Sequence, residues 1–419
     1  MRSYLNLALK VLTRRKFFTF ISLFGITLTL VVLVVATAVL DDTFAAKGQE
    51  RRFDRALVLY RVMEIGPSST MSMNPGYGFL EKYVLNLPGI ERATAFSEPG
   101  QRTIYHHGVR IDTRFKRADA NFWKVLDFEF LEGRPFTADE ESRGAFVAVI
   151  TDDLRDRLFG GGKAAGKTTG KTVEIDGSRY TIIGVVPAVP VTRRAAYSEI
   201  WAPTTTTKSS GWRTELLGTY NAVVLLNDAG DRSRVKQAFA DVVKTIPVTG
   251  KEFTTWKAGL DTVFEATARD MFGSSLPRDY SGSPANVLRT VLVVLAVMFM
   301  TLPALNLITL NLSRILERAP EIGVRKAFGA PRRSLVWQFV LENVLLALIG
   351  GLIAFFLAAI VLGMLNGSGI IPHSAFSPNL RVFGYGMLVA AFFGVFSGAY
   401  PAWRMSRLNP VNALRGGAA

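Results

Sequence analysis

Residues 161–168 read Gly-Gly-Lys-Ala-Ala-Gly-Lys-Thr and match the GxxxxGK[ST] spacing of a phosphate-binding loop. Such a loop binds phosphates when it leaves a strand and opens a helix, because backbone N–H groups and the helix dipole then point at the anion. Here a helix-like run at 152–159 precedes the loop and a strand-like run at 172–175 follows it. The context is inverted, so we interpret 161–168 as a glycine-rich turn.

No other combination of residues predicts catalysis, a cofactor or a metal site. His106 and His107 are adjacent, and neighbouring side chains on a strand point to opposite faces, which makes them a poor ligand pair. The acidic run at 139–141 is typical of a turn or a helix start. The abundant serines have no nearby histidine in a recognisable motif. We therefore expect that the chain itself is not an enzyme.

A short charged segment at 317–330 separates two strongly hydrophobic ones. Pro320 suits a first helical turn, and the acidic residues lie near that end while the basic residues lie near the other, as the helix dipole favours (Glu317 and Glu321; Arg325 and Lys326). The pattern predicts a small polar helix against the membrane face. Such a helix could dock a soluble partner or could only turn the chain, and its charge pattern alone does not separate the two.

Four hydrophobic segments are long enough to cross a membrane: 17–40, 289–312, 335–363 and 382–403. The first has 24 residues without charge, about 36 Å of helix at about 1.5 Å per residue. The sequence therefore predicts an integral membrane α-helical protein with four transmembrane helices, one plus three. Residues 41–288 would form a large external domain.

Charge near the membrane predicts the orientation, because lysine and arginine are retained on the cytoplasmic side. Basic residues dominate 1–16, 313–334 and 404–419, so both termini are expected in the cytoplasm and 41–288 outside the inner (plasma) membrane. Residues 41–288 carry 33 basic and 31 acidic residues, or +2, and the remainder of the +15 net charge, +13, borders the membrane. This distribution fits anionic lipid and argues against nucleic-acid binding.

The external segment alternates strand-like and helix-like patterns. Strands are expected at 56–62 and 221–226, with helices at 79–85 and 234–243. Asp176-Gly177 between two strand-like runs predicts a tight hairpin. We expect an external α/β domain built from both ends of the segment, with an inserted β-rich lobe at about 116–205. The chain has no cysteine, so this domain depends on its core and not on disulfides.

Three parts of the sequence together resemble the MacB/FtsX-type permeases of ATP-binding-cassette (ABC) transporters. The first is the charged loop with the start of the next hydrophobic segment, 314–330 and 338–342. The second is the C-terminal run, 400–415. The third is a set of external segments that resemble a periplasmic core domain: 133–136, 146–150, 158–160 and 180–185. The order of the segments matches the family across essentially the whole chain.

The resemblance implies a permease subunit that works as a dimer, with an identical copy or a paralogue, on a separate cytoplasmic ABC ATPase. The charged loop would be the coupling helix that docks this ATPase, through Glu317, Arg318, Glu321, Ile322, Gly323, Val324, Arg325, Lys326 and Phe328. An amphipathic helix at 1–16 would lie beside the ATPase, and a periplasmic adaptor can join such complexes. ATP hydrolysis would move the external domain, which is mechanotransmission, to export or extract a substrate outside the inner membrane.

A different function class also fits the layout. The chain could be a membrane receptor or regulator whose external domain senses a ligand, or controls an external hydrolase, through a partner. No ligand motif in the sequence identifies a substrate.

Overall fold

The computed structural model describes residues 16–106, 108–160, 167–209, 211–272, 284–317 and 332–406. The chain divides into two compact units. One, which we call the helical unit, contains the residues up to Asp41, Arg289–Ile370 and the residues from Ala375 onward. The other, the α/β unit, contains Asp42–Leu288 and Ile371–Ser374.

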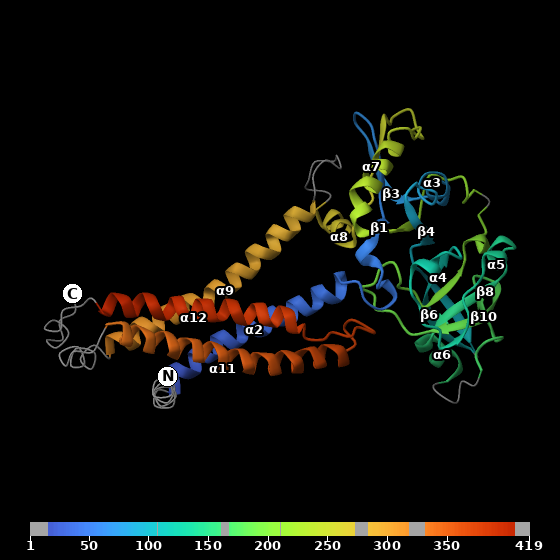
Figure 1. Ribbon diagram of the computed structural model, residues 1–419. Coiled ribbons are helices and arrows are strands. Elements are labelled where there is room, and N and C mark those ends of the chain that lie inside the picture. Colours follow the sequence, from blue (N-terminus) through green and yellow to red (C-terminus); the bar gives the residue numbers. More distant parts are fainter. Residues whose placement is uncertain are drawn as a thin grey trace. The chain divides into compact units, whose positions relative to one another are not determined.

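The helical unit is built on four long helices (Figure 1): α2 (Lys16–Phe44), α9 (Pro284–Glu317), α11 (Arg332–Gly367) and α12 (Leu380–Ser406). Among the described residues, three stretches are long and apolar enough to span a membrane: Thr19–Phe44, Pro284–Thr301 and Val340–Gly367. The apolar part of α12 that the structure describes, Leu380–Phe396, is shorter. The expected fourth span therefore stays a prediction.

Close approach between α2 and α11 depends on small residues. Ile26 and Leu30 of α2 cluster with Leu346 and Ala354 of α11. Thr27 Oγ1 donates a hydrogen bond to Gly350 O over 3.1 Å. Helices in a membrane associate through such packing and interhelical hydrogen bonds, because lipid removes the hydrophobic drive between them.

The α/β unit contains a ten-stranded mixed sheet. In spatial order its main path runs β1 (Ala56–Leu59), β13 (Tyr220–Leu226), β4 (Ile90–Ser97), β6 (Val109–Ala118), β11 (Ile200–Pro203), β8 (Val147–Thr151), β10 (Ser178–Val186) and β7 (Glu132–Gly133). Two further strands pair beside this path, β5 (Gly100–His106) on β6 and β9 (Thr172–Ile175) on β10. The β6–β11 and β8–β10 pairs are parallel and the others are antiparallel. The strands of the β-rich region at 116–205 thus continue the sheet that β1 and β13 begin.

The strands β1 and β13, at the start of this order, are buried on both faces. Leu57 and Leu59 of β1 belong to one core cluster, and Ala56 and Val58 belong to another on the opposite face. Alternating side chains of a strand point to opposite faces, so a continuous apolar run is what a strand covered on both sides requires. A third cluster lies under β8, β9 and β10.

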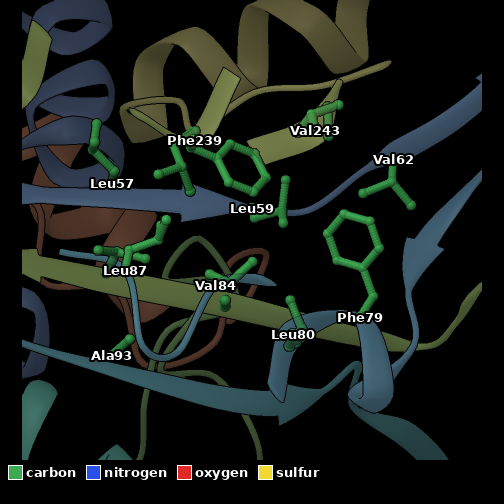
Figure 2. Close-up of a cluster of buried hydrophobic side chains, with 14 of the residues drawn as sticks. Leu57, Leu59, Val62, Phe79, Leu80, Val84, Leu87, Ala93, Phe239 and Val243 are labelled. Atoms are coloured by element: carbon green, nitrogen blue, oxygen red, sulfur yellow. The ribbon is translucent and has the colours of Figure 1, made fainter. Parts of the chain in front are cut away.

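A second sheet and several helices cover the first cluster. The second sheet has the order β12 (Leu217–Gly218), β3 (Thr70–Pro75), β2 (Val62–Ile65) and β14 (Thr255–Ala258). Figure 2 shows Phe239 of α7 (Arg232–Val243) in one cluster with Leu59, Val84 and Phe79, the last from α3 (Tyr77–Tyr83). The other helices are short: α4 (Phe122–Val125), α5 (Ala138–Ser142), α6 (Asp152–Phe159) and α8 (Val263–Phe272), with 3₁₀ turns at Gly48–Glu50, Phe53–Arg55, Thr204–Thr206 and Ala229–Asp231.

The expected hairpin at Asp176-Gly177 is confirmed. Ser178 pairs with Ile175 across a two-residue turn, and both turn residues have positive φ, 51° and 69°. A turn of this kind needs left-handed backbone at both central positions, which Asp and Gly tolerate. The hairpin joins β9 to β10.

We expect Gly350→Leu to disrupt the packing of α2 on α11. A Cβ added at Gly350 would lie 3.0 Å from Ile26 Cγ2 and 3.3 Å from Ile26 Cβ, and a β-branched side chain has little freedom to move away. Overpacking of this kind costs about 1–3 kcal/mol, which should lower the thermal unfolding midpoint of the purified protein. Gly363→Leu is the matched control, since an added Cβ there meets nothing within 4 Å. Equal midpoints for the two variants would contradict this packing.

Candidate functional site

The residues predicted to dock an ATPase begin at the end of α9. Glu317 is the last residue of that helix. The others, Arg318, Glu321, Ile322, Gly323, Val324, Arg325, Lys326 and Phe328, lie outside the described residues. Their docking role stays a prediction.

The last residue of the phosphate-loop match contacts a carboxylate. Residues 161–166 lie outside the described part of the chain, but Thr168 is buried, and its backbone N–H donates to Glu132 Oε2 over 3.0 Å. Its hydroxyl lies 3.5 Å from Glu132 Oε1. A negative charge at this position repels phosphate. Together with α6 before the loop and β9 after it, Glu132 supports the interpretation of a turn.

The two neighbouring histidines do not form a site that the structure describes. His106 ends β5, and its ring lies 5.2 Å from the ring of Phe159, edge to face. His107 lies outside the described residues.

A more informative region is the segment at 42–50, which we call the α2 exit. The helix α2 continues beyond the helical unit through Asp42 to Phe44, which belong to the α/β unit. Within that unit Arg193 Nη1 donates to Ala45 O over 2.6 Å. Thr192 Oγ1 donates to Asp42 Oδ2 over 3.4 Å. The loop between β10 and β11, residues 187–199, therefore binds the first residues of the α2 exit.

A buried ion pair completes this attachment. Arg193 Nη1 lies 3.5 Å from Glu50 Oε2, and the backbone N–H of Ala196 donates to Glu50 Oε1 over 3.2 Å. Glu50 and Arg193 are only 3% and 5% exposed. Burial raises the pKa of Glu50, while Arg193 and the Ala196 N–H act in the opposite direction. Removing one partner of a buried pair leaves an uncompensated charge and costs about 3–5 kcal/mol, so Glu50 and Arg193 require each other at this position.

The α2 exit also packs on α8. The ring centroids of Phe44 and Phe264 are 5.2 Å apart, with the planes at 72°. The start of α8 is fixed by a capping box, in which Thr262 N donates to Glu265 Oε2 over 2.6 Å and Glu265 N donates to Thr262 Oγ1 over 3.3 Å. The exit, Arg193 and the start of α8 surround a cavity of about 300 Å³.

Comparison with known proteins identifies the family. Residues 19–242, more than half of the chain, match the MacB-like periplasmic core domain. Residues 293–410 match the FtsX-like permease C-terminal domain. The chain belongs to the MacB/FtsX-type family of ABC transporter permeases. The α/β unit is accordingly the external domain of this permease, and the apolar helices are its membrane part.

Two relatives and one solved structure are similar to this chain. An uncharacterized ABC transporter permease of Bacillus subtilis, YknZ, is 25% identical over 339 residues, 80% of this chain and 77% of that protein. The macrolide export ATP-binding/permease protein MacB of Salmonella typhi is 24% identical over 420 residues, 99% of this chain but only 60% of that protein. The periplasmic region of MacB from Actinobacillus actinomycetemcomitans, a solved structure, covers 53% of this chain and 94% of that region, with 14% identity and a TM-score of 0.38.

A buried lysine ties the 187–199 loop of the permease to its sheet. Lys116 on β6 is fully buried and lies opposite Trp201 of β11. Its Nζ donates to Ala195 O over 2.7 Å and to Arg194 O over 3.2 Å, and it lies 4.8 Å from the ring centroid of Phe96. Burial lowers the pKa of Lys116 to about 7, although nearby glutamates act to raise it.

Sequence reasoning did not single out this junction. The signal was present as two consecutive arginines, Arg193 and Arg194, in a segment (187–199) whose only other charged residue is Glu199. Charged side chains are seldom buried unless they are paired, so such a doublet indicates buried partners without naming them.

We expect Lys116→Met to remove a pH dependence of stability from the permease. The pKa of Lys116 falls from 10.5 to about 7 on folding, so between these values the unfolded chain binds more protons than the native one. The free energy of unfolding of the wild type then rises with pH in this window, by up to about 1.4 kcal/mol per pH unit. Urea unfolding followed by tryptophan fluorescence, at about pH 7.5 and about pH 9.5, measures this rise.

The exposed Lys124→Met is the control for that experiment, and it should keep the rise of the wild type. If the Lys116→Met protein gained as much stability as the wild type between the two pH values, Lys116 would not be the group that titrates.

Proposed function

We propose that this chain is a permease subunit that transmits the ATPase cycle of a separate cytoplasmic ABC ATPase to its external domain. The observation that carries the proposal is the continuity of α2. One helix contains the apolar stretch Thr19–Phe44 and ends inside the external domain, where buried polar contacts hold the residues that follow it. A displacement of α2 along its axis is thereby passed to the domain and not lost in a flexible linker.

The relatives support export as the outcome. Proteins similar to this chain are named for the export of macrolides and of pyoverdine. We propose that the chain works as a dimer, with an identical copy or a paralogue, and that it acts on a substrate outside the inner membrane. The proposed organisation keeps four spans, with the coupling helix in the cytoplasmic loop at 313–334.

The topology can be tested by labelling, because the chain has no cysteine of its own. We expect cysteines introduced at Ser178 and Ser233 to react with a membrane-impermeant thiol reagent in intact spheroplasts. A cysteine at Ser313 should react only after the membrane is opened, because the basic flanks retain that loop in the cytoplasm. The opposite labelling pattern would reverse the proposed orientation.

The coupling helix can be tested by charge reversal. An exposed ion pair contributes only about 0–1 kcal/mol, so single changes should be mild. The double variant Glu321→Lys/Arg325→Glu turns attraction into repulsion at two positions, and we expect at least about tenfold weaker capture of the ATPase. Gly323→Leu should act in the same direction by blocking close approach.

The control reverses an exposed pair in the external domain, Asp139→Arg/Arg143→Glu, whose side chains are 2.6 Å apart. It should bind the ATPase as the wild type does, at an equal level of expression. Unchanged capture by the loop variants would show that 317–328 is only a connector.

A further inference from the structure

Arg194 has different partners from its neighbour Arg193. Its Nη1 donates to Asp270 Oδ2 over 2.7 Å. Its Nη2 donates to Glu98 Oε1 over 2.7 Å. Asp270 lies near the end of α8, the last described element of the external domain before α9, whereas Glu98 directly follows the central strand β4. One guanidinium therefore joins the second membrane-linked end of the domain to its sheet.

The partners of Arg194 are themselves held in place. Glu98 also accepts hydrogen bonds from Asn221 Nδ2 over 2.9 Å and Asn74 Nδ2 over 3.2 Å. Burial alone would raise the pKa of Glu98, but Arg194 and the Asn221 hydrogen bond lower it overall. The guanidinium carbon lies 4.2 Å from the ring centroid of Tyr60, in cation–π geometry. Glu98 thus stays ionised opposite a guanidinium whose plane is fixed.

Three attachments therefore meet at two consecutive residues. Arg193 holds the α2 exit through Ala45 O and Glu50. Arg194 holds α8 and the sheet through its two carboxylates. The backbone of Arg194 and of the next residue is fixed to β6, since Lys116 Nζ donates to the carbonyls of Arg194 and Ala195.

We propose that Arg193 and Arg194 form a clamp that couples the α2 exit and α8 to the ten-stranded sheet, and that these two arginines are positioning residues for mechanical transmission. The inference rests on the proposed function. The α2 exit follows α2 and α8 precedes α9, so the two ends held by the clamp are those joined to two membrane helices. Because one segment holds both ends and is itself fixed to β6, a displacement of either end reaches the sheet directly.

The chemistry of arginine makes a sharp test possible. A guanidinium presents several donors in a planar fork and can bond two carboxylates at once, whereas a lysine ammonium is a single point charge on a flexible stem. Arg194→Lys keeps the charge but should not hold Glu98 and Asp270 together. Asp270→Asn removes the charge of one partner and leaves the contact with Glu98.

The experiment uses the full chain in lipid with its ATPase partner. Spin labels on cysteines introduced at the exposed Glu174 and Ser233 report on β9 and on α7, at separate places in the external domain. We expect ATP to change the distance between the labels in the otherwise unmodified chain. Arg194→Lys and Asp270→Asn should each reduce the fraction of molecules that respond by at least about twofold, and the double variant should be no worse than the stronger single one.

A purely structural role of Arg194 and Asp270 would change the stability of the protein or its interaction with the ATPase. Capture of the ATPase, its hydrolysis rate and the thermal unfolding midpoint should stay close to those of the unmodified chain in both variants. Arg134→Lys, at an exposed arginine that pairs with Glu140, is the matched control and should respond fully. If Arg194→Lys strongly lowers the thermal unfolding midpoint, the response of Asp270→Asn decides whether the clamp transmits motion, because this variant leaves the Glu98 contact intact.

The outcomes separate the two proposals. Without any ATP-dependent change of distance in the unmodified chain, mechanical transmission itself fails. A full response of both variants beside a responsive unmodified chain overturns the clamp and leaves the proposed function standing. A response that falls only in proportion to the folded fraction also overturns the clamp.

Discussion

The proposed transmission depends on the buried pair of Arg193 and Glu50, which joins the α2 exit to the loop between β10 and β11. A charge removed from water must be compensated nearby, and here the compensation comes from a segment that directly follows a membrane helix. The pair fixes more than its own geometry. Glu50 also accepts the Ala196 N–H, so it holds the loop both at Arg193 and just after the arginine doublet.

The surroundings of this pair explain why the loop can be rigid without regular secondary structure. Residues between β10 and β11 form few ladder hydrogen bonds, so their backbone groups need other partners. Lys116 supplies two hydrogen bonds to this loop, one to the carbonyl of Arg194 and one to the carbonyl of Ala195. The sheet beneath is covered on both faces, and close-packed interiors transmit strain with little compression. A buried lysine thus holds the loop here, and its burial lowers its pKa far below that of a free lysine.

Local patterns of the sequence predicted local structure well. The Asp176-Gly177 turn, the strand expected at 221–226 and the helix expected at 234–243 all appear, because turn chemistry and periodicity act over a few residues. Long apolar runs likewise predicted α2, α9 and α11, whose apolar stretches are long enough to span a membrane. The continuity of one sheet through the β-rich region was beyond such reasoning, since no periodicity records which strands pair.

The junction itself could not be derived from the sequence, for a reason that concerns its chemistry. Arg193 meets Glu50 across 143 residues, and Arg194 meets Asp270 across 76. Catalytic and phosphate-binding sites leave recognisable spacings because a reacting group or ligand dictates the geometry. A mechanical link has no such ligand and requires only paired charges and close packing, which many sequences satisfy. The phosphate-loop match shows the converse, because a familiar spacing at 161–168 ends at Thr168, whose partner is the carboxylate of Glu132. In this permease the motif without its context does not indicate nucleotide binding, and the arginine doublet acquires its proposed role only through partners that folding brings to it.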